Sequence, residues 1–338
     1  MLPLTNPSGC VKVEAVEFSI VSLAQQLATE GDAYRFLEEL RWGDQPVCPH
    51  CGSVRPPYFL TPKNGGRKTR TGTVSERRVW KCADCRKQFS VLTGTVFHGT
   101  KIPVRKWVFV IFEMCSSKNG VAAREIERKY DLTPKAAWFM LHRLREAMKR
   151  DPIAGLLSGR VVADESYYGG KPSNRHGHKR GKGGQGQTDK MPIIALVSRE
   201  TGEVRSRAVP DVTGENLARV LGEELDAEAT HLHTDSARHY GPIGRGFASH
   251  EAVNHDAGEY VRGDVTTNHA EGYFSQLKRS LDGTHHHVSR AHLDRYLAEF
   301  DYRYSTRKAS DTERMQRLLG RQVAGRRLMY RDSPSWRE

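Results

Sequence analysis

Four of the six cysteines form two Cys-x-x-Cys pairs, a spacing that serves metal binding or thiol redox chemistry. Cys48 and Cys51 lie in CPHC, Cys82 and Cys85 lie in CADC, and residues 52–81 separate the two pairs. Two such turns offer four thiolates at the corners of a tetrahedron, which suits Zn²⁺ at about 2.3 Å from each sulfur. Redox dithiols or unrelated thiols are the alternatives, but in a reducing compartment the pattern favours a metal. We therefore predict one structural Zn²⁺ on these four residues.

Three acidic residues occupy positions from which carboxylates could bind metal ions. Asp164 interrupts the apolar stretch VVADESYY, where a carboxylate is costly unless it is paired or binds a metal. Asp235 ends a predicted strand in HTDS, and ligands bind at strand ends in open α/β sheets. Glu271 lies on a predicted helix over 267–282. Together they could hold two Mg²⁺ (or Mn²⁺) ions for phosphodiester chemistry. The alternative is that all three are ordinary solvated acids.

The helix predicted around Glu271 has two distinct faces. At 100° per residue, Asn268, Glu271 and Lys278 fall within about 80° of one another. The opposite side is apolar and consists of Tyr273, Phe274, Leu277 and Leu281. The polar face would therefore present an acid, an amide and a lysine to one place, with Lys278 gripping a phosphate as a point charge. Arg279, the next residue, is a further candidate DNA contact.

Two short helices upstream resemble a helix-turn-helix. Residues 121–130 and 134–149 have helical periodicity, and the turn DLTP separates them. A second helix of this kind reads bases when it enters the major groove. The candidate DNA contacts lie off its apolar face and are Lys135, His142, Arg143 and Arg145. Any small helical bundle gives the same pattern, so the motif is weak alone.

The segment 171–190, KPSNRHGHKRGKGGQGQTDK, is rich in glycine and basic residues and has no apolar period. Such a segment cannot pack into a core, and we expect a mobile loop. Lys179, Arg180 and Lys182 could close over a phosphate backbone; a plain solvated insertion is the alternative.

The elements that must position the acids alternate between strand and helix after residue 150. We expect a strand at 161–170, a hairpin over 191–209 with Thr201-Gly202 in its turn, and further strands at 229–237 and 251–255. Helices at 214–226 and 267–282, and a last one in AHLDRYLAEFDYRYS, complete a mixed α/β layer.

Composition narrows the class of protein. The chain has 338 residues, enough for two or three domains, and a formal net charge of +13, which favours polyanions such as nucleic acid. No apolar run approaches the roughly 18–20 residues of a membrane span, and the N-terminus lacks the pattern of a secretory signal. We therefore expect a cytoplasmic, nucleoid-associated protein with no membrane partner.

Six motifs occur in a fixed order: CPHCGS, WKCADCRKQFSVLTGTVF, DESYYGGK, HTDS, TNHAEGYFSQLKR and HLDRYLAEFDYR. In this order they resemble the zinc-ribbon DDE transposases of bacterial insertion sequences, over about residues 30–310. The resemblance implies a ribonuclease-H-like catalytic domain and Mg²⁺-dependent cutting and joining of transposon ends. Its double-stranded DNA partners would be those ends and the target, bound by a homo-oligomer.

By motif, the resemblance carries the catalytic acids onto Asp164, Asp235 and Glu271. Some relatives use Asn and Lys near the third position. How much Asn268 and Lys278 each contribute to the active site beside Glu271 is therefore left open. Ser305 stands where we expect relatives to carry Asn, which would weaken the end of the last helix.

The whole chain is then predicted to be an α/β protein with a ribonuclease-H-like mixed sheet flanked by helices, preceded by a zinc ribbon and a helical domain. The expected segments are an N-terminal helical segment (1–45), the ribbon (46–98), the helix-turn-helix-like DNA-binding domain (99–152), the catalytic domain (153–310) and a basic tail (311–338). A DNA-binding regulator on an inactive core and a hydrolytic nuclease are the rival functions. An intact acid triad argues against the regulator, whereas the nuclease would use the same metals.

Overall fold

The computed structural model separates the chain into two compact units. Unit 1 combines residues 1–148 with 309–333, and unit 2 contains residues 149–308 with the last five residues. The structure describes residues 17–61, 66, 68, 72, 74–149, 154–169, 190–236, 239–254, 257–259, 261–325 and 328–330. No helix within these ranges is long and apolar enough to cross a membrane.

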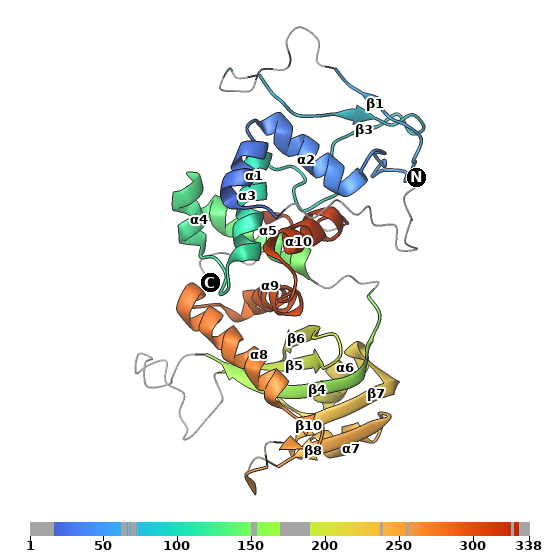
Figure 1. Ribbon diagram of the computed structural model, residues 1–338, viewed down its shortest axis with the longest axis vertical. Helices are drawn as coiled ribbons and strands as arrows, with labels where there is room; N and C mark the ends of the chain where they lie inside the picture. Colours follow the sequence, from blue (N-terminus) through green and yellow to red (C-terminus); the bar gives the residue numbers. More distant parts are fainter. Residues whose placement is uncertain are drawn as a thin grey trace. The chain divides into compact units, whose positions relative to one another are not determined.

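A small three-stranded antiparallel sheet carries the two cysteine turns in unit 1. Its strands are β1 (Tyr58–Phe59), β2 (Trp80–Lys81) and β3 (Gln88–Phe89), in that order across the sheet. Helix α1 (Ile20–Gln26) and helix α2 (Glu30–Trp42) precede it in the chain (Figure 1). Glu38 of α2 ties helix to ribbon, because its carboxylate accepts hydrogen bonds from Trp80 Nε1 at 2.9 Å and Arg78 Nε at 2.7 Å.

Three further helices of unit 1 follow the ribbon: α3 (Val104–Ser116), α4 (Ala123–Tyr130) and α5 (Pro134–Met148). Helices α4 and α5 pack against each other across a three-residue turn. Asp131 ends α4 in the left-handed conformation, with φ at 49°, and turns the chain sharply into α5. The predicted pair of helices and its short turn are thus present.

Residues 311–322, expected to begin a basic tail, are helical. Helix α10 (Asp311–Arg317) begins with a capping box, in which Ser310 and Glu313 bond each other's backbone N–H groups, and η6 (Leu318–Gln322) continues it. Helix α10 packs on α3 and η6 packs on α2, with Met315, Leu318 and Leu319 buried. These apolar residues among the arginines supply a core face, which explains why both helices belong to unit 1.

Unit 2 is built on a five-stranded mixed sheet in the order β6-β5-β4-β7-β8. The strands are β4 (Leu157–Tyr168), β5 (Met191–Ser198), β6 (Val204–Ala208), β7 (Leu225–Asp235) and β8 (Ser249–Val253). The first three pair antiparallel, whereas β4, β7 and β8 run parallel. Gly202, with φ at 72°, lies in the β5–β6 turn, so the predicted hairpin is confirmed. This topology is the ribonuclease-H-like arrangement that the resemblance implied.

Helices cover both faces of this sheet (Figure 1). On one face, α8 (Asn268–Arg279) and α9 (Leu293–Ser305) bury Ala270, Phe274 and Leu297 against Val162 and Ala195. On the other, α6 (Gly214–Glu224) and α7 (Tyr240–Gly244) pack against the alternate residues of the same strands, such as Ala163 and Ile194. The hairpin β9 (Val261–Arg262) and β10 (Val265–Thr266) leads into α8, and the turns η4 (Ser280–His285) and η5 (Arg290–His292) join α8 to α9.

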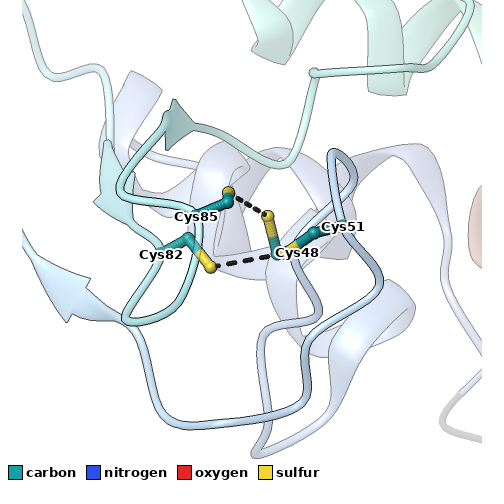
Figure 2. Close-up of side chains that lie close together, drawn as sticks. All are labelled: Cys48, Cys51, Cys82 and Cys85. Carbon is teal, nitrogen blue, oxygen red and sulfur yellow. Dashed lines mark hydrogen bonds between the residues drawn. The ribbon is translucent and has the colours of Figure 1, made fainter.

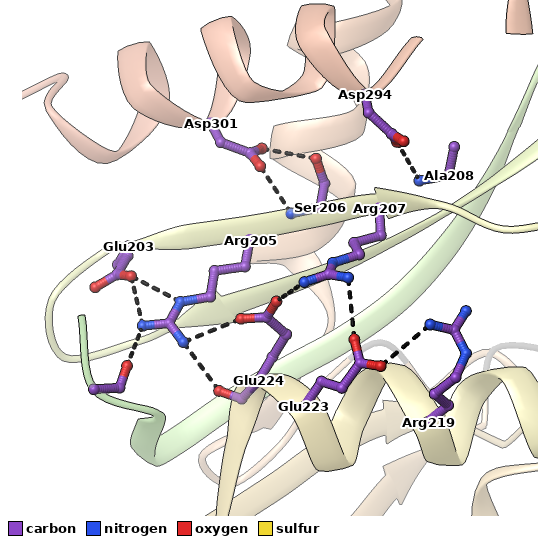
Figure 3. A network of polar contacts seen from close by, with 11 residues as sticks. Glu203, Arg205, Ser206, Arg207, Ala208, Arg219, Glu223, Glu224, Asp294 and Asp301 are labelled. Atoms are coloured by element: carbon purple, nitrogen blue, oxygen red, sulfur yellow. Dashed lines mark hydrogen bonds and ion pairs between the residues drawn. The ribbon is translucent and has the colours of Figure 1, made fainter. Parts of the chain in front are cut away.

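The edge strand β6 is closed by side chains rather than by another strand (Figure 3). Three of its backbone N–H groups point away from β5, and each donates to α9: Val204 to Ser305 Oγ at 2.9 Å, Ser206 to Asp301 Oδ2 at 2.8 Å and Ala208 to Asp294 Oδ1 at 3.3 Å. On the other face of β6, Arg205 and Arg207 bind the carboxylate of Glu224 at the end of α6, at 3.2 and 2.6 Å. An edge covered in this way cannot pair with another chain.

Candidate functional site

The four paired cysteines come together in the geometry of a zinc site (Figure 2). Cys48 Sγ lies 3.7 Å from Cys85 Sγ, Cys51 Sγ lies 3.7 Å from Cys82 Sγ, and all four sulfurs are within 4.8 Å of one another. Four sulfurs at about 2.3 Å from a tetrahedral Zn²⁺ would be separated by roughly 3.8 Å. The cluster therefore fits a zinc ion.

Two equivalent turns aim these thiols at one point. In the first, Cys48 N–H bonds the Ser53 carbonyl at 3.0 Å, and in the second Cys82 N–H bonds the Lys87 carbonyl at 3.0 Å. The thiols affect one another: although burial opposes ionisation, hydrogen bonds from the backbone N–H groups of Cys85 and Asp84 lower the pKa of the Cys82 thiol. Against a hydrogen bond from the Ser53 N–H, burial and the neighbouring thiols raise the pKa of the Cys51 thiol. A thiol that ionises readily is the form that binds metal.

Two of the three predicted acids lie on neighbouring parallel strands. Val162 of β4 is the register partner of His233 of β7, and Asp164 and Asp235 each stand two residues further along. Since side chains two residues apart share a face, both carboxylates project from the same side of the sheet. Asp164 pairs with Ala195, which belongs to the core beneath α8 and α9. The carboxylates therefore face the helix that carries Glu271.

The charges that act on Asp164 include those of the other two acids. Burial, joined by the negative charges of Glu165, Asp235 and Glu271, raises the pKa of its carboxyl to about 7, although a 2.8 Å hydrogen bond from Glu165 N–H acts in the opposite direction. An excess of negative charge at a half-buried carboxylate is what a bound cation would relieve.

Glu271 and its companions lie on the exposed face of α8. Asn268, Glu271 and Lys278 are all exposed, and Glu271 Oε1 accepts a hydrogen bond from the buried Thr267 hydroxyl at 3.1 Å. The opposite face of α8 is buried, as its periodicity predicts. The carboxylates are more widely spaced than the thiols: in the part of the chain that the structure describes, only the cysteine cluster brings three or more such ligand atoms within 4.8 Å.

Sequence reasoning missed two residues beside these acids. Glu165 follows Asp164 on the opposite face of β4, and its carboxylate accepts a 2.6 Å hydrogen bond from the Tyr240 hydroxyl. Burial raises the pKa of Glu165, and Tyr240 is fully buried. The acidic pair Asp164-Glu165 was visible in the sequence, but nothing in it indicated a partner 75 residues away.

Three of the four basic residues predicted on α5 do not face solvent, and that prediction is wrong. His142, Arg143 and Arg145 are 0%, 6% and 1% exposed. Arg143 donates to the His98 carbonyl at 2.7 Å, and its guanidinium lies 5.5 Å from the centre of the Trp107 ring. Helix α5 contacts both α4 and η6, so positions off its main apolar stripe are buried too.

The remaining candidate DNA contacts are exposed or lie outside the described residues. Lys135 is exposed in the first turn of α5, 4.2 Å above the Tyr330 ring. Arg279 is exposed at the end of α8 and donates to Ser275 Oγ at 3.2 Å. Lys179, Arg180 and Lys182 lie outside the described residues.

Comparison with known proteins agrees with this division of the chain. Residues 156–305 match the family model of the ISXO2-like transposase domain, and residues 28–88 match that of the transposase zinc-ribbon domain. A protein of Halobacterium salinarum, described as an uncharacterized protein in transposable element ISH50, is 28% identical over 301 residues, which cover 86% of this chain and 96% of that protein.

A ribonuclease-H-like sheet preceded by a four-cysteine ribbon defines the class as a DNA-processing protein with a zinc ribbon. Within that class, the chain is similar to transposases of insertion sequences, through a transposase domain in unit 2 and a transposase zinc ribbon in unit 1.

Proposed function

We propose that the protein binds the ends of its insertion sequence and cuts and joins DNA strands by two-metal phosphodiester chemistry. The observation that carries the proposal is the placement of Asp164 among the acids: its carboxylate faces α8, and the charges of Asp235 and Glu271 raise its pKa. The match to a transposase domain over the same residues supports this reaction over plain DNA binding.

Asp164, Asp235 and Glu271 would hold the divalent ions, Mg²⁺ or Mn²⁺. Such ions, when bound, activate the attacking oxygen and stabilise the leaving oxygen of a phosphodiester. The residues fit this role because they offer hard oxygen ligands in a region of excess negative charge. Thr267 orients the Glu271 carboxylate through its hydrogen bond.

Two side chains beside Glu271 would handle the DNA rather than the metals. Lys278 lies two turns along the exposed face of α8, from where its ammonium would hold a phosphate near the reacting bond. Asn268 lies one turn before Glu271 and would supply an amide to the same place. Both positions agree with a DNA strand that runs along this face.

DNA-end recognition would belong mainly to unit 1. The cysteine cluster, holding one Zn²⁺, would fix the ribbon, and the exposed start of α5, with Lys135, would contact DNA. Residues at the N-terminal end of a recognition helix are those that reach base edges.

The test is incubation of the purified protein with Mg²⁺, insertion-sequence ends and a supercoiled target. A transposase cuts at the ends and joins them to the target. A nuclease would cut without joining, and a regulator would bind without cutting; either result would overturn the proposal.

A further inference from the structure

A part-buried hydrogen bond connects β4, the strand of Asp164, to helix α7, which follows the strand of Asp235. Helix α7 begins five residues after Asp235, and its first residue, Tyr240, donates to Glu165 Oε2 at 2.6 Å. Tyr240 lies in the core on the α6 side of the sheet, together with Ala163. The start of α7 is thereby bonded to β4 next to Asp164, on the face of the sheet opposite to the Asp164 side chain.

The end of β7 is also hydrogen-bonded to β8, the strand on its other side. The Ser236 hydroxyl, next to Asp235, donates to the Val253 carbonyl at 2.8 Å, and the Thr234 hydroxyl lies 2.9 Å from His250 Nε2. Asp235 is therefore held from both neighbouring strands. The backbone pairing of β4 with β7 reaches Val162 and His233, and the Tyr240–Glu165 bond adds a connection beyond this point.

Glu165 itself faces away from the other acids. Its register partner is Ile194, which belongs to the core on the α6 side, whereas the partner of Asp164 is Ala195 on the α8 side. Adjacent residues of a strand point to opposite faces. The hydroxyl of Tyr240 also fixes the Glu165 carboxylate in this direction.

We propose that Glu165 and Tyr240 are positioning residues: their hydrogen bond sets the spacing of Asp164 and Asp235, and Glu165 is not a metal ligand. This inference rests on the proposed function, in which those two acids hold the ions. Partners that orient metal ligands typically change metal affinity or activity by about 10–100-fold when they are removed.

The test compares Tyr240→Phe, Glu165→Ala, Glu165→Gln and the double variant Glu165→Ala/Tyr240→Phe. Two quantities are measured: Mn²⁺ binding to the DNA-free protein by electron paramagnetic resonance, and the Mg²⁺ concentration that gives half-maximal cleavage. We expect Tyr240→Phe and Glu165→Ala each to weaken metal binding by about tenfold or more, with affinity for DNA ends unchanged. The double variant should be no worse than either single one, since one bond is lost in all three.

Glu165→Gln separates positioning from ligation. The glutamine side chain keeps an oxygen that can accept from Tyr240, so metal affinity should stay within about threefold of wild type. A collapse of metal binding in Glu165→Gln, with Tyr240→Phe unaffected, would make Glu165 a ligand and overturn the proposal. Unchanged metal binding in all the variants would overturn it as well.

Ser305→Ala is the matched control, because it removes one hydrogen bond from the distant edge strand β6 of the same sheet. It should lower thermal stability without changing metal affinity. If the wild-type protein shows no Mg²⁺-dependent cleavage, the proposed function fails. If the wild-type protein does cleave but the variants do not show the expected metal affinities, only the positioning role fails.

Discussion

At the scale of single residues, the two cysteine turns have the same left-handed backbone position but different residues there. The residue after the second cysteine is left-handed in both: Gly52 has φ at 71° and Arg86 has φ at 60°. A glycine adopts this conformation freely, whereas a side chain there costs about 1–2 kcal/mol. The ribbon therefore carries strain at Arg86 that the metal and the packing around Phe89 must offset.

Gly52→Ala should weaken the ribbon through backbone strain alone, because an added Cβ would meet no atom within 4 Å. We expect a loss of about 1 kcal/mol, seen as faster release of zinc to a competing chelator. Arg86→Gly should slow that release or leave it unchanged. Zinc retention equal to wild type in Gly52→Ala would contradict the left-handed turn.

Asp164 is a second residue that costs stability, because its carboxyl is buried among other acids. Burial raises the pKa of its folded-state carboxyl to about 7, above the unfolded value near 3.9. The folded state therefore holds the proton more tightly, and this contribution to stability is present below about pH 4 and lost as the pH rises to about 7.

Asp164→Asn should consequently stabilise the protein in Mg²⁺-free buffer at high pH while abolishing cleavage. We expect a gain of about 1–3 kcal/mol at pH 8 and little gain near pH 4. Urea unfolding at both pH values measures the difference. A variant less stable than wild type at pH 8 would show that Asp164 is not repelled by its neighbours.

At the scale of elements, α9 and β6 illustrate what periodicity can and cannot predict. The hairpin, α9 and the buried face of α8 follow from alternating and helical patterns. The contacts that Ser305 and Asp301 make with β6 do not, because they join residues about 100 positions apart. Ser305 is the last residue of α9, and its hydroxyl accepts the Val204 N–H.

Ser305→Ala should lower the free energy of unfolding of unit 2 by about 1 kcal/mol, since the Val204 N–H loses its acceptor. Thermal unfolding monitors the change. Ser305→Asn, which offers an amide oxygen, should recover part of the loss. An alanine variant as stable as wild type would mean that the edge N–H is satisfied by water.

Periodicity also fails to predict which basic residues of α5 are buried, because burial depends on contacts with other elements. A single amphipathic stripe on α5 predicted that Arg143 and Arg145 would be exposed, but a helix packed on several sides buries residues beyond its stripe. The fold of the C-terminal segment was missed for a related reason: its apolar residues are few, and only their contacts with α2 and α3 reveal a core.

At the scale of the whole molecule, the formal charge of +13 predicts DNA binding that weakens with salt. Each phosphate contact contributes about −0.9 to the slope of log K against log salt concentration. Lys135→Ala should therefore make the slope for an insertion-sequence end shallower by about one unit. Arg219→Ala is the control, because this arginine on α6 is paired with Glu223. Equal slopes for Lys135→Ala and wild type would show that Lys135, at the start of α5, does not contact a phosphate.

The central claim is tested most directly by the rate of strand cutting in Asp235→Asn, measured beside its affinity for DNA ends. The substitution keeps the size of the side chain but removes one charge from a site meant for two divalent ions. Losing metal-derived stabilisation costs several kcal/mol in the transition state, so cutting and joining should fall by several orders of magnitude. Affinity for the end should stay near wild type or rise slightly, as repulsion of phosphates is reduced. A folded variant that binds DNA and still cuts at about a tenth of the wild-type rate or faster, a loss of only about 1.4 kcal/mol, would contradict the two-metal mechanism.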